Sequence, residues 1–309
     1  MRIFLNGIGA FGLDVFTRLR EAGEEIVAVA APAKSLSGRA DRLSAAAEAA
    51  GVPVYETAKL GEPEVEAALR SHGAELGVMA FVNDFINRSV LDLPTNGTIQ
   101  YHPSLLPKHR GRSSINWAII QGEARTGATI FWPDEGVDTG PVLLQREVEI
   151  GPDDTAGSLY YDKLYPLGID LLAEAVTLVK EGRAPKLVQD EAEMTYERPC
   201  QGRAARIDWR LPVGEVYNLI RGCEPSPGAW TRLGEQTIKI TGARPLDDVP
   251  GEPGVVSVID EKGIIVGAKY GSIFVRQLQL ESGAAAPAHE VAPQAGLKVG
   301  DRFLNPRVD

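Results

Sequence analysis

The stretch RIFLNGIGAFG, residues 2–12, decides the fold of the start of the chain. Its apolar residues predict a strand over 2–6, and its three glycines form a G-x-G-x-x-G arrangement before a helix predicted over 11–22. A strand that passes through a glycine-rich turn into a helix is the first half of a strand–helix–strand unit. The stretch therefore predicts an α/β domain at this end of the chain.

The same alternation continues through the first half of the sequence. We expect further strands over 25–30, 52–55, 76–81, 98–101 and 129–132, and helices over 39–50, 62–71 and 159–180. Strands alternating with helices favour a mainly parallel sheet covered on both faces. Ligands of such sheets bind beyond the carboxyl ends of the strands, so the residues that follow each strand are candidates for a site.

The last third of the chain has a different character. The segment 183–204 is polar and irregular, which predicts a linker. After it, a helix over 213–221 precedes short β-rich runs separated by glycine-containing turns. This spacing predicts a smaller β-rich, barrel-like domain over 205–309, so the larger α/β domain is expected over 1–182.

The composition limits which classes of function and partner are expected for the chain. The chain of 309 residues is 44% apolar and 24% charged, as in ordinary globular proteins. Its apolar runs stay well short of the roughly 20 residues that span a bilayer, and its start has no signal-peptide layout, so we expect no membrane partner. Two cysteines without ligand spacing favour the cytoplasm. The net charge of -10 weighs against a nucleic-acid partner.

The glycine-rich start has two interpretations. A G-x-G-x-x-G motif between a strand and a helix is typical of dinucleotide binding. That interpretation also needs an acidic residue at the end of the second strand, where this chain has Val29-Ala30-Ala31-Pro32. We therefore favour close strand-to-helix packing without a dinucleotide.

The strongest chemical signal lies in two later segments. The first, QYHPSLLPKHRG (residues 100–111), places His102, Ser104 and Arg110 around two prolines that fix the backbone, directly after a predicted strand. The second, DEGVDTG (residues 134–140), places Asp134 and Asp138 in a glycine-containing turn after another strand. A histidine and a carboxylate on rigid turns suit proton-transfer chemistry, and two acids four apart favour one functional acid plus one turn-former. Metal-ligand spacing and a G-x-S-x-G nucleophile motif are both missing, so we expect no metal.

These two segments resemble the formyltransferase family that uses N10-formyltetrahydrofolate. The family is marked by an H-x-S-L-L-P-x-x-R-G segment and a D-x-G-x-D-T-G segment, both present here in the same order. Within the family, the sequence is most similar to the hydrolase domain of 10-formyltetrahydrofolate dehydrogenases, with which it shares the residues at 115–117, 130–132 and 152–155. Methionyl-tRNA formyltransferases are also similar.

The resemblance implies a fold and a site. The fold is a Rossmann-like, folate-binding catalytic domain over 1–182 with an OB-like C-terminal domain. The catalytic residues would be His102 and Asp138, with Gln100 at the place where the family's transferases usually carry an asparagine. The expected folate-binding residues are Phe81, Val82, Asn83, Ser104, Arg110, Asp134 and Val137. For Arg110, a structural role in bridging loops is an alternative.

The resemblance also implies a reaction. We expect N10-formyltetrahydrofolate as the formyl donor and a small acceptor, most simply an amine. Hydrolysis of the donor to formate is the close alternative, because Gln100 replaces the usual asparagine. A methionyl-tRNA acceptor is disfavoured by the acidic charge and by the short, mildly basic segment 33–42. A folate-binding module without catalysis is the alternative from another class.

Overall fold

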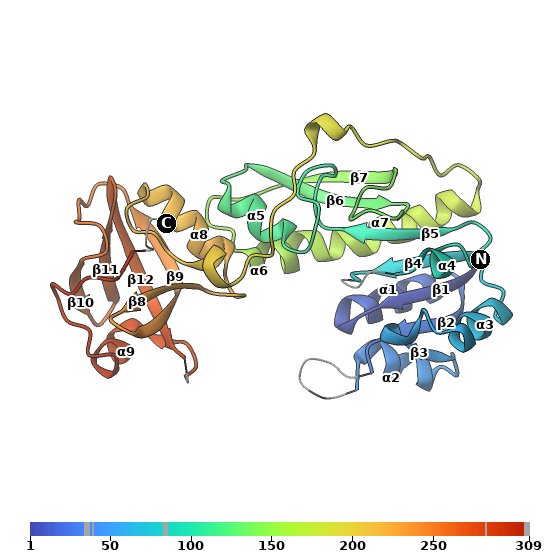
Figure 1. Ribbon diagram of the computed structural model, residues 1–309, viewed down its shortest axis with the longest axis horizontal. Coiled ribbons are helices and arrows are strands. Elements are labelled where there is room, and N and C mark those ends of the chain that lie inside the picture. Colours follow the sequence, from blue (N-terminus) through green and yellow to red (C-terminus); the bar gives the residue numbers. More distant parts are fainter. Residues whose placement is uncertain (34–37, 39, 83–85, 282, 306–309) are drawn as a thin grey trace. The chain divides into compact units, whose positions relative to one another are not determined.

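The computed structural model describes residues 1–33, 38, 40–82, 86–281 and 283–305. The chain forms two compact units, which Figure 1 shows with their elements labelled. The first unit comprises residues 1–112, 127–148 and 162–196, and the second comprises residues 113–126, 149–161 and 197–309. Much of the segment that the sequence suggested as a linker, residues 183–196, is thus part of the first unit.

The first unit is built on a seven-stranded sheet of order β3-β2-β1-β4-β5-β6-β7. The pairs β3–β2, β2–β1, β1–β4 and β4–β5 are parallel, whereas β6 runs antiparallel to β5. The order changes direction between β1 and β4, which makes this the topological switch point of the sheet. The strands are β1 Arg2–Gly7, β2 Glu25–Ala31, β3 Val54–Glu56, β4 Leu76–Ala80, β5 Thr98–His102, β6 Arg125–Phe131 and β7 Val142–Glu149.

Helices cover both faces of this sheet. On one face, α1 contacts both α2 and α7. On the other face, Leu69 of α3 and Val90 and Leu91 of α4 pack in one cluster with Phe4 of β1 and Met79 of β4. The helices of the first unit are α1 Gly9–Glu21, α2 Arg42–Ala49, the short 3₁₀ turn Thr57–Lys59, α3 Pro63–Ser71, α4 Arg88–Leu91, α7 Tyr165–Lys180 and the 3₁₀ turn Glu191–Glu193.

The predicted fold class is confirmed, with differences in detail. The antiparallel β6, the strand β7 and the short helix α4 were not predicted as such from the sequence. The long helix predicted over 159–180 is divided into a π-helix, Leu159–Leu164, and α7, Tyr165–Lys180. Pro166 lies in the first turn of α7, where a missing backbone N–H costs nothing, so the proline marks a helix start rather than a bend.

The second unit is an antiparallel β-rich fold. Its sheet has the order β10-β11-β12-β9-β8, and β13 pairs with β12. The helix α8 packs on β9 and against α5, and α9 packs on β12. Its elements are α5 Ser114–Ile120, α6 Ala156–Ser158, the 3₁₀ turn Gly202–Ala205, α8 Val213–Gly222, β8 Ala229–Leu233, β9 Gln236–Leu246, β10 Val256–Asp260, β11 Gly263–Ala268, β12 Gly271–Leu280, β13 Ala286–Pro287 and α9 Ala288–Gln294.

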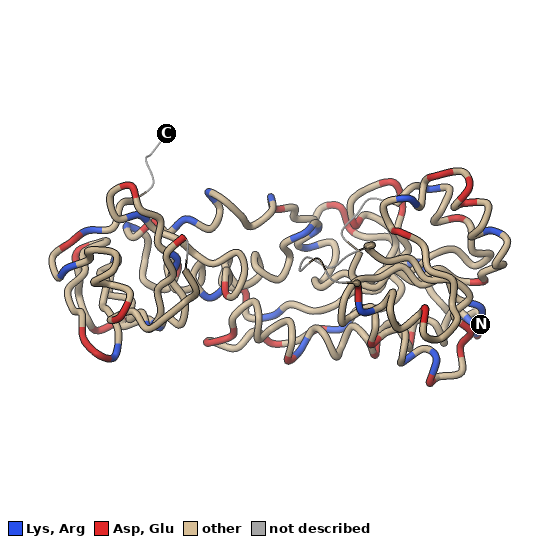
Figure 2. Tube along the Cα trace, turned by 90° about the horizontal axis from the view of Figure 1, so that it is seen from below, with Lys and Arg blue, Asp and Glu red and all other residues tan. Residues whose placement is uncertain are grey.

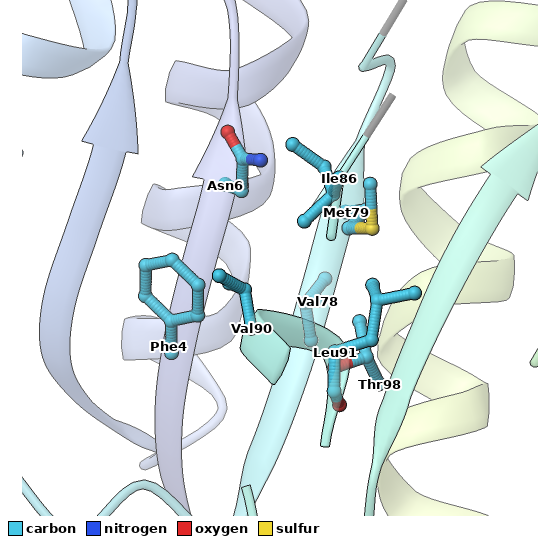
Figure 3. A pocket seen from close by; sticks show the side chains of 8 residues that line it. All are labelled: Phe4, Asn6, Val78, Met79, Ile86, Val90, Leu91 and Thr98. Carbon is cyan, nitrogen blue, oxygen red and sulfur yellow. The ribbon is translucent and has the colours of Figure 1, made fainter. Parts of the chain in front are cut away.

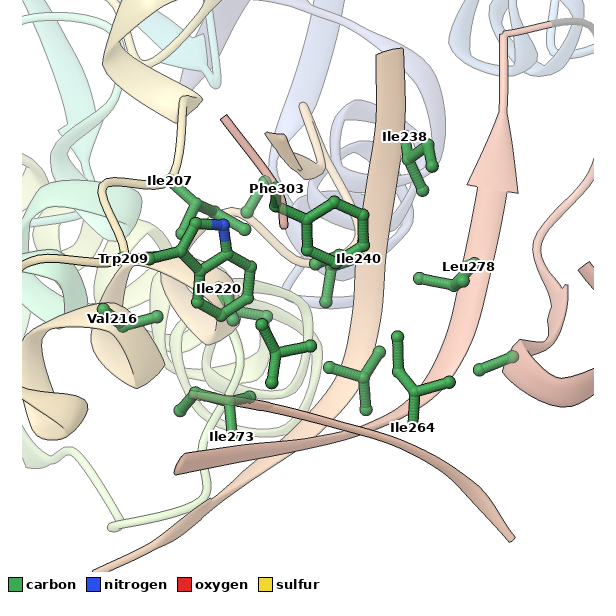
Figure 4. Packing of buried hydrophobic residues seen from close by; sticks show 14 of the residues in the cluster. Ile207, Trp209, Val216, Ile220, Ile238, Ile240, Ile264, Ile273, Leu278 and Phe303 are labelled. Carbon is green, nitrogen blue, oxygen red and sulfur yellow. The ribbon is translucent and has the colours of Figure 1, made fainter. Parts of the chain in front are cut away.

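The core of the second unit is centred on Trp209 and Phe303 (Figure 4). Both side chains are fully buried, and their rings stack with centroids 5.8 Å apart. The indole N–H of Trp209 donates to the hydroxyl of Thr231 over 3.0 Å, so its one polar group is satisfied. The residue thus combines a large apolar surface with a paired hydrogen bond.

We expect Trp209→Ala to destabilise the second unit by about 3–5 kcal/mol, because it leaves a large cavity and an unpaired Thr231 hydroxyl. Chemical denaturation followed by circular dichroism would measure the loss. The exposed Tyr270→Ala serves as the control, since its ring lies largely in solvent. An equal loss of stability in both variants would contradict the expectation.

The distribution of charged residues and the lengths of the helices concern nucleic-acid and membrane partners. Figure 2 shows lysines and arginines interspersed with acidic residues along both units, with no basic stretch in the described part of the chain. Among the same residues, every helix is too short or too polar to cross a bilayer.

Candidate active site

The site is built at the carboxyl end of β5, where the strand ends at His102. Because successive residues of a strand face opposite sides, Gln100 and His102 lie on one face of the sheet and Tyr101 on the other. The ring of Tyr101 stacks on Phe11 of α1 at 4.9 Å between centroids. This packing anchors the strand, so the face carrying α3 and α4 is also the face to which His102 is directed.

His102 is buried and is held through both ring nitrogens. Its Nε2 lies 2.9 Å from the backbone carbonyl oxygen of His109, which can only accept, so Nε2 carries a proton. Its Nδ1 lies 3.5 Å from Oδ2 of Asp138. In the neutral ring, Nδ1 therefore presents its lone pair on the side of the carboxylate. The distance is too long for a good direct hydrogen bond, so this face of the ring can still accept a proton.

Asp138 lies in the turn that follows β6 and is held in an unusual backbone conformation. Its φ is 54°, in the left-handed region that non-glycine residues seldom occupy. Its Oδ2 accepts a hydrogen bond from the backbone N–H of Gly111 over 2.8 Å. The same oxygen thus faces the imidazole and is fixed by the segment that follows His102.

Asp134, in the same turn, has a different environment. Its Oδ1 accepts from the backbone N–H of Gly136 over 3.0 Å and from the hydroxyl of Thr139 over 2.5 Å. This is the pattern of an aspartate that closes its own turn. The structure therefore brings Asp138, and not Asp134, against His102.

Arg110 is buried and engaged within the protein. Its Nη2 donates to Gln189 over 2.8 Å and to Glu191 over 2.7 Å, while Nε and Nη1 donate to the same two side chains. The hydrogen bonds from Arg110 hold the pKa of the Glu191 carboxyl below its ordinary value. Gln189 in turn donates to the backbone oxygens of Asp138 and Gly140. Arg110 is thus linked to the Asp138 turn through Gln189.

Gln100 belongs to a row of side chains across three strands. Met79 of β4 is in register with both Gln100 and Asn6, so all three face the same side of the sheet. Among the described residues, nothing hydrogen-bonds the Gln100 side chain. A small cavity of about 10 Å³ lies beside this row, and Figure 3 shows the amide nitrogen of Asn6 turned toward it. Within the described residues that buried nitrogen has no partner, although Asn6 Oδ1 accepts from Thr57.

The remaining predicted folate contacts are only partly gathered here. Phe81, with a φ of 63°, follows β4 and is succeeded by the buried Val82, whereas Asn83 lies outside the described residues. The side chain of Val137 is about half exposed, at 51%. Ser104 is fully buried and donates to the backbone oxygen of Lys108 over 2.6 Å. Its hydroxyl is therefore committed to the turn.

The turn that follows β6 lies near the start of α4. The salt bridge to Asp92 raises the pKa of Arg88 on α4, and the carboxylates of Glu135 and Asp134 add smaller contributions. Such contributions require that the start of α4 and the turn after β6 lie near each other. β4 is the parallel neighbour of β5, so the segments that follow these two strands leave the sheet at the same end.

The glycine-rich start has an internal partner. The buried carboxylate of Asp41 accepts from the backbone N–H of Gly9 over 2.8 Å and from that of Leu43 over 2.8 Å. One backbone N–H of the first turn of α1 is thus bound by a side chain of the protein, where a dinucleotide phosphate would otherwise bind. This arrangement supports the packing interpretation of the motif.

Several residues of the site escaped prediction. Gln189, the backbone oxygen of His109 and the backbone N–H of Gly111 contact or support the pair. Backbone groups carry no side-chain signal, and Gln189 lies in a segment whose composition indicated only a linker. In the described part of the chain, no cluster of three or more histidine, cysteine or acidic side chains could hold a metal ion.

Comparison with known proteins identifies the family of the chain. The model of the family "Formyl transferase" matches residues 1–176, and "Formyl transferase, C-terminal domain" matches residues 201–295. The cytosolic 10-formyltetrahydrofolate dehydrogenase of Homo sapiens is 41% identical over 302 residues, which is 92% of this chain and 33% of that protein. The chain thus spans about a third of the length of these dehydrogenases.

Two further likenesses cover the whole chain. The methionyl-tRNA formyltransferase of Geobacter metallireducens is 34% identical over 98% of both proteins. The crystal structure of HypX from Aquifex aeolicus, in complex with tetrahydrofolic acid, has a TM-score of 0.71 at 18% identity. It covers 100% of this chain and 50% of that chain, and it confirms the fold. From the two family matches and these identities, the chain belongs to the formyl transferase family.

Proposed function

We propose that the protein takes the formyl group from N10-formyltetrahydrofolate and passes it to a small amine acceptor. The observation that carries the proposal is the buried His102–Asp138 pair, 3.5 Å apart at the end of a strand, in a chain of this family. The donor is inferred from the family motifs and from the 10-formyltetrahydrofolate dehydrogenases that the chain resembles. The acidic net charge of -10 favours a small acceptor over tRNA.

His102 and Asp138 would carry out the proton transfer together. An amine that adds to the formyl carbon must lose a proton, and the oxygen of the adduct gains negative charge. With Nε2 fixed on the His109 carbonyl, Nδ1 of His102 is the nitrogen that can accept the proton. The resulting imidazolium would be stabilised by Asp138, and it would return the proton to N10 as tetrahydrofolate leaves.

Gln100 would contribute a donor for the developing oxyanion. It lies two residues before His102 on the same face, about 7 Å away along the strand. Its amide has no competing partner among the described residues, so it is free to turn toward a substrate oxygen. A preorganised hydrogen-bond donor at the position where charge develops is typical of acyl-transfer sites.

The folate contacts divide into two groups. Phe81 and Val82 follow β4, the parallel neighbour of β5, and Val137 precedes Asp138 in its turn, so we assign the pterin to the space near these segments. Asn83, which lies outside the described residues, stays a prediction for the same group. Ser104, Arg110 and Asp134 hold their turns through internal hydrogen bonds. For these three we propose support of the folate site rather than direct contact.

Hydrolysis of the donor is the second candidate. It is favoured by the 41% identity to a 10-formyltetrahydrofolate dehydrogenase, because the motifs shared with these proteins resemble those of their hydrolase domain. Water would take the place of the amine, and the same pair would accept its proton. Formate would then be the product.

Product analysis decides between the candidates. The protein is incubated with N10-formyltetrahydrofolate alone and with a panel of primary amines, including amino sugars, and the products are identified by mass spectrometry. Transfer predicts a formylated amine and little formate without an acceptor, whereas hydrolysis predicts formate regardless of the amine. Absence of tetrahydrofolate release in every reaction would refute both.

The role of Gln100 is tested by Gln100→Leu and Gln100→Asn. We expect the leucine variant to lower kcat by up to about a hundredfold, because an oxyanion donor is lost. The asparagine variant keeps an amide on a shorter arm and should retain more activity. Steady-state rates of tetrahydrofolate release measure both, and equal rates for the leucine variant and the parent would contradict the role.

A further inference from the structure

We propose that the segment 185–196, here called the strap, positions the catalytic pair, and that Gln189 and Thr195 are its positioning residues. The inference rests on the proposed function, because it assigns to the strap a role in the reaction of His102 and Asp138. Neither residue is directed at a substrate. Each acts on the backbone that carries or holds one member of the pair.

The strap follows the edge of the first unit through a series of contacts. The indole of Trp132 donates to the backbone of Pro185 over 2.9 Å, and Leu187 pairs with Val142 of β7 through two backbone hydrogen bonds. Further along, Thr195 exchanges backbone hydrogen bonds with Pro107 and Arg110. The strap is therefore attached both to Trp132 and β7 and to the segment 107–110 that follows His102.

The strap holds Asp138 and His109, two of the left-handed non-glycine residues of the site. Asp138 and His109 each have a φ of 54°, a conformation that a side chain with a Cβ adopts only when its surroundings enforce it. Gln189 donates to the backbone oxygens of Asp138 and Gly140 over 2.8 and 2.6 Å. The hydroxyl oxygen of Thr195 accepts a hydrogen bond from the backbone N–H of His109 over 2.8 Å. One segment thus fixes both left-handed residues.

The backbones of His109 and Asp138 set the geometry of the His102–Asp138 pair. The His109 carbonyl accepts from Nε2 of His102, and so determines which ring nitrogen faces the carboxylate. Asp138 must hold its left-handed turn for Oδ2 to reach the Gly111 N–H and the imidazole together. Releasing either backbone would misplace a reacting group, and a displacement of about 1 Å can cost on the order of a hundredfold in rate.

Gln189 is suited to this task because its amide is fully used. The oxygen accepts from Arg110, and the two N–H groups supply the two carbonyls of the Asp138 turn. The side chain is buried, with 7% of its surface exposed. A glutamate of the same shape would still pair with Arg110 but would face two carbonyl oxygens without a donor. This variant therefore tests the contact with the Asp138 turn separately from the contact with Arg110.

The test compares Gln189→Glu, Thr195→Val and Thr195→Ser with the parent protein. We expect Gln189→Glu and Thr195→Val to lower kcat about ten- to a hundredfold with KM changed less than about threefold, because the folate contacts remain. Thr195→Ser keeps the hydroxyl acceptor and should restore most of the rate. Val188→Ala, on an exposed strap side chain, is the control and should behave as the parent.

A second readout does not depend on turnover. In protein with ¹⁵N-labelled histidine, the chain's four histidines give separate ring signals, and His102→Gln identifies those of His102. We expect the His102 ring nitrogens to shift in Gln189→Glu and Thr195→Val, and those of His72 to stay in place. Unchanged His102 signals together with an unchanged kcat would overturn the inference. Shifted signals in a protein without formyl transfer or hydrolysis would support the strap and refute the proposed function.

Discussion

His102→Gln is expected to lower kcat for tetrahydrofolate release by about a hundred- to ten-thousand-fold, the usual range for an acid–base group. Glutamine has nearly the reach of the imidazole and can still donate to the His109 carbonyl, so the local fold should persist. It cannot take up a proton near neutral pH, which removes the step assigned to Nδ1. Steady-state kinetics with N10-formyltetrahydrofolate measures the loss.

The matched control is His72→Gln. His72 follows α3, in the connection that leads to the start of β4, and its Nε2 is paired with the hydroxyl of Tyr55 at 2.7 Å. The His72→Gln variant should keep kcat within about twofold of the parent. A parent-like rate for His102→Gln would remove His102 from the mechanism, and an equal loss in both variants would point to a general effect on folding.

Asp138→Asn should lower kcat by a similar factor, about a hundredfold or more, with a smaller change in KM. The asparagine oxygen can still accept from the Gly111 N–H, so the turn keeps its contact. The lost property is the negative charge 3.5 Å from Nδ1, which stabilises the imidazolium. The rate should therefore fall without loss of folate binding, measured by titration with tetrahydrofolate.

Asp134→Asn is the control for charge in the same turn. Its side chain would keep the acceptor for Gly136 and Thr139, so the turn should hold and the rate should stay near that of the parent. The double variant His102→Gln with Asp138→Asn should lose little more than either single variant, because the two act as one unit. Additive losses would show that they act independently.

Local signals in the sequence predicted the mainly parallel sheet well. In β1, the apolar run at residues 3–5 is fully buried, and the glycine turn leads into α1 as expected. The strand predicted over 129–132 corresponds to β6, but its antiparallel direction was not predicted, because strand direction is set by pairing with neighbours and not by composition. The edge strand β7 was not predicted. Half-exposed strands such as β7 also carry weak patterns.

The sequence named candidate residues for the site but could not give their geometry. His102 and Asp138 stood out from their motifs, and the structure places them 3.5 Å apart. The partners of Arg110 were not predictable, because Gln189 and Glu191 lie far along the chain in a segment with no periodicity. Asn6 lies in one row with Met79 and Gln100, and its amide nitrogen has no partner among the described residues. This arrangement became visible only once neighbouring strands were in register.

The sequence by itself determined which residue types occupy the ends of β5 and β6, because prolines, glycines and apolar runs act on their own neighbours. It also determined the family, because two long motifs occur in order. Only the tertiary structure decided which nitrogen of His102 faces Asp138, and which of the two aspartates meets it. Those choices depend on the His109 carbonyl, the Gly111 N–H and the Gln189 amide. These groups become neighbours of the pair only when the chain is folded, since hydrogen bonds between distant segments leave no periodic trace in the sequence.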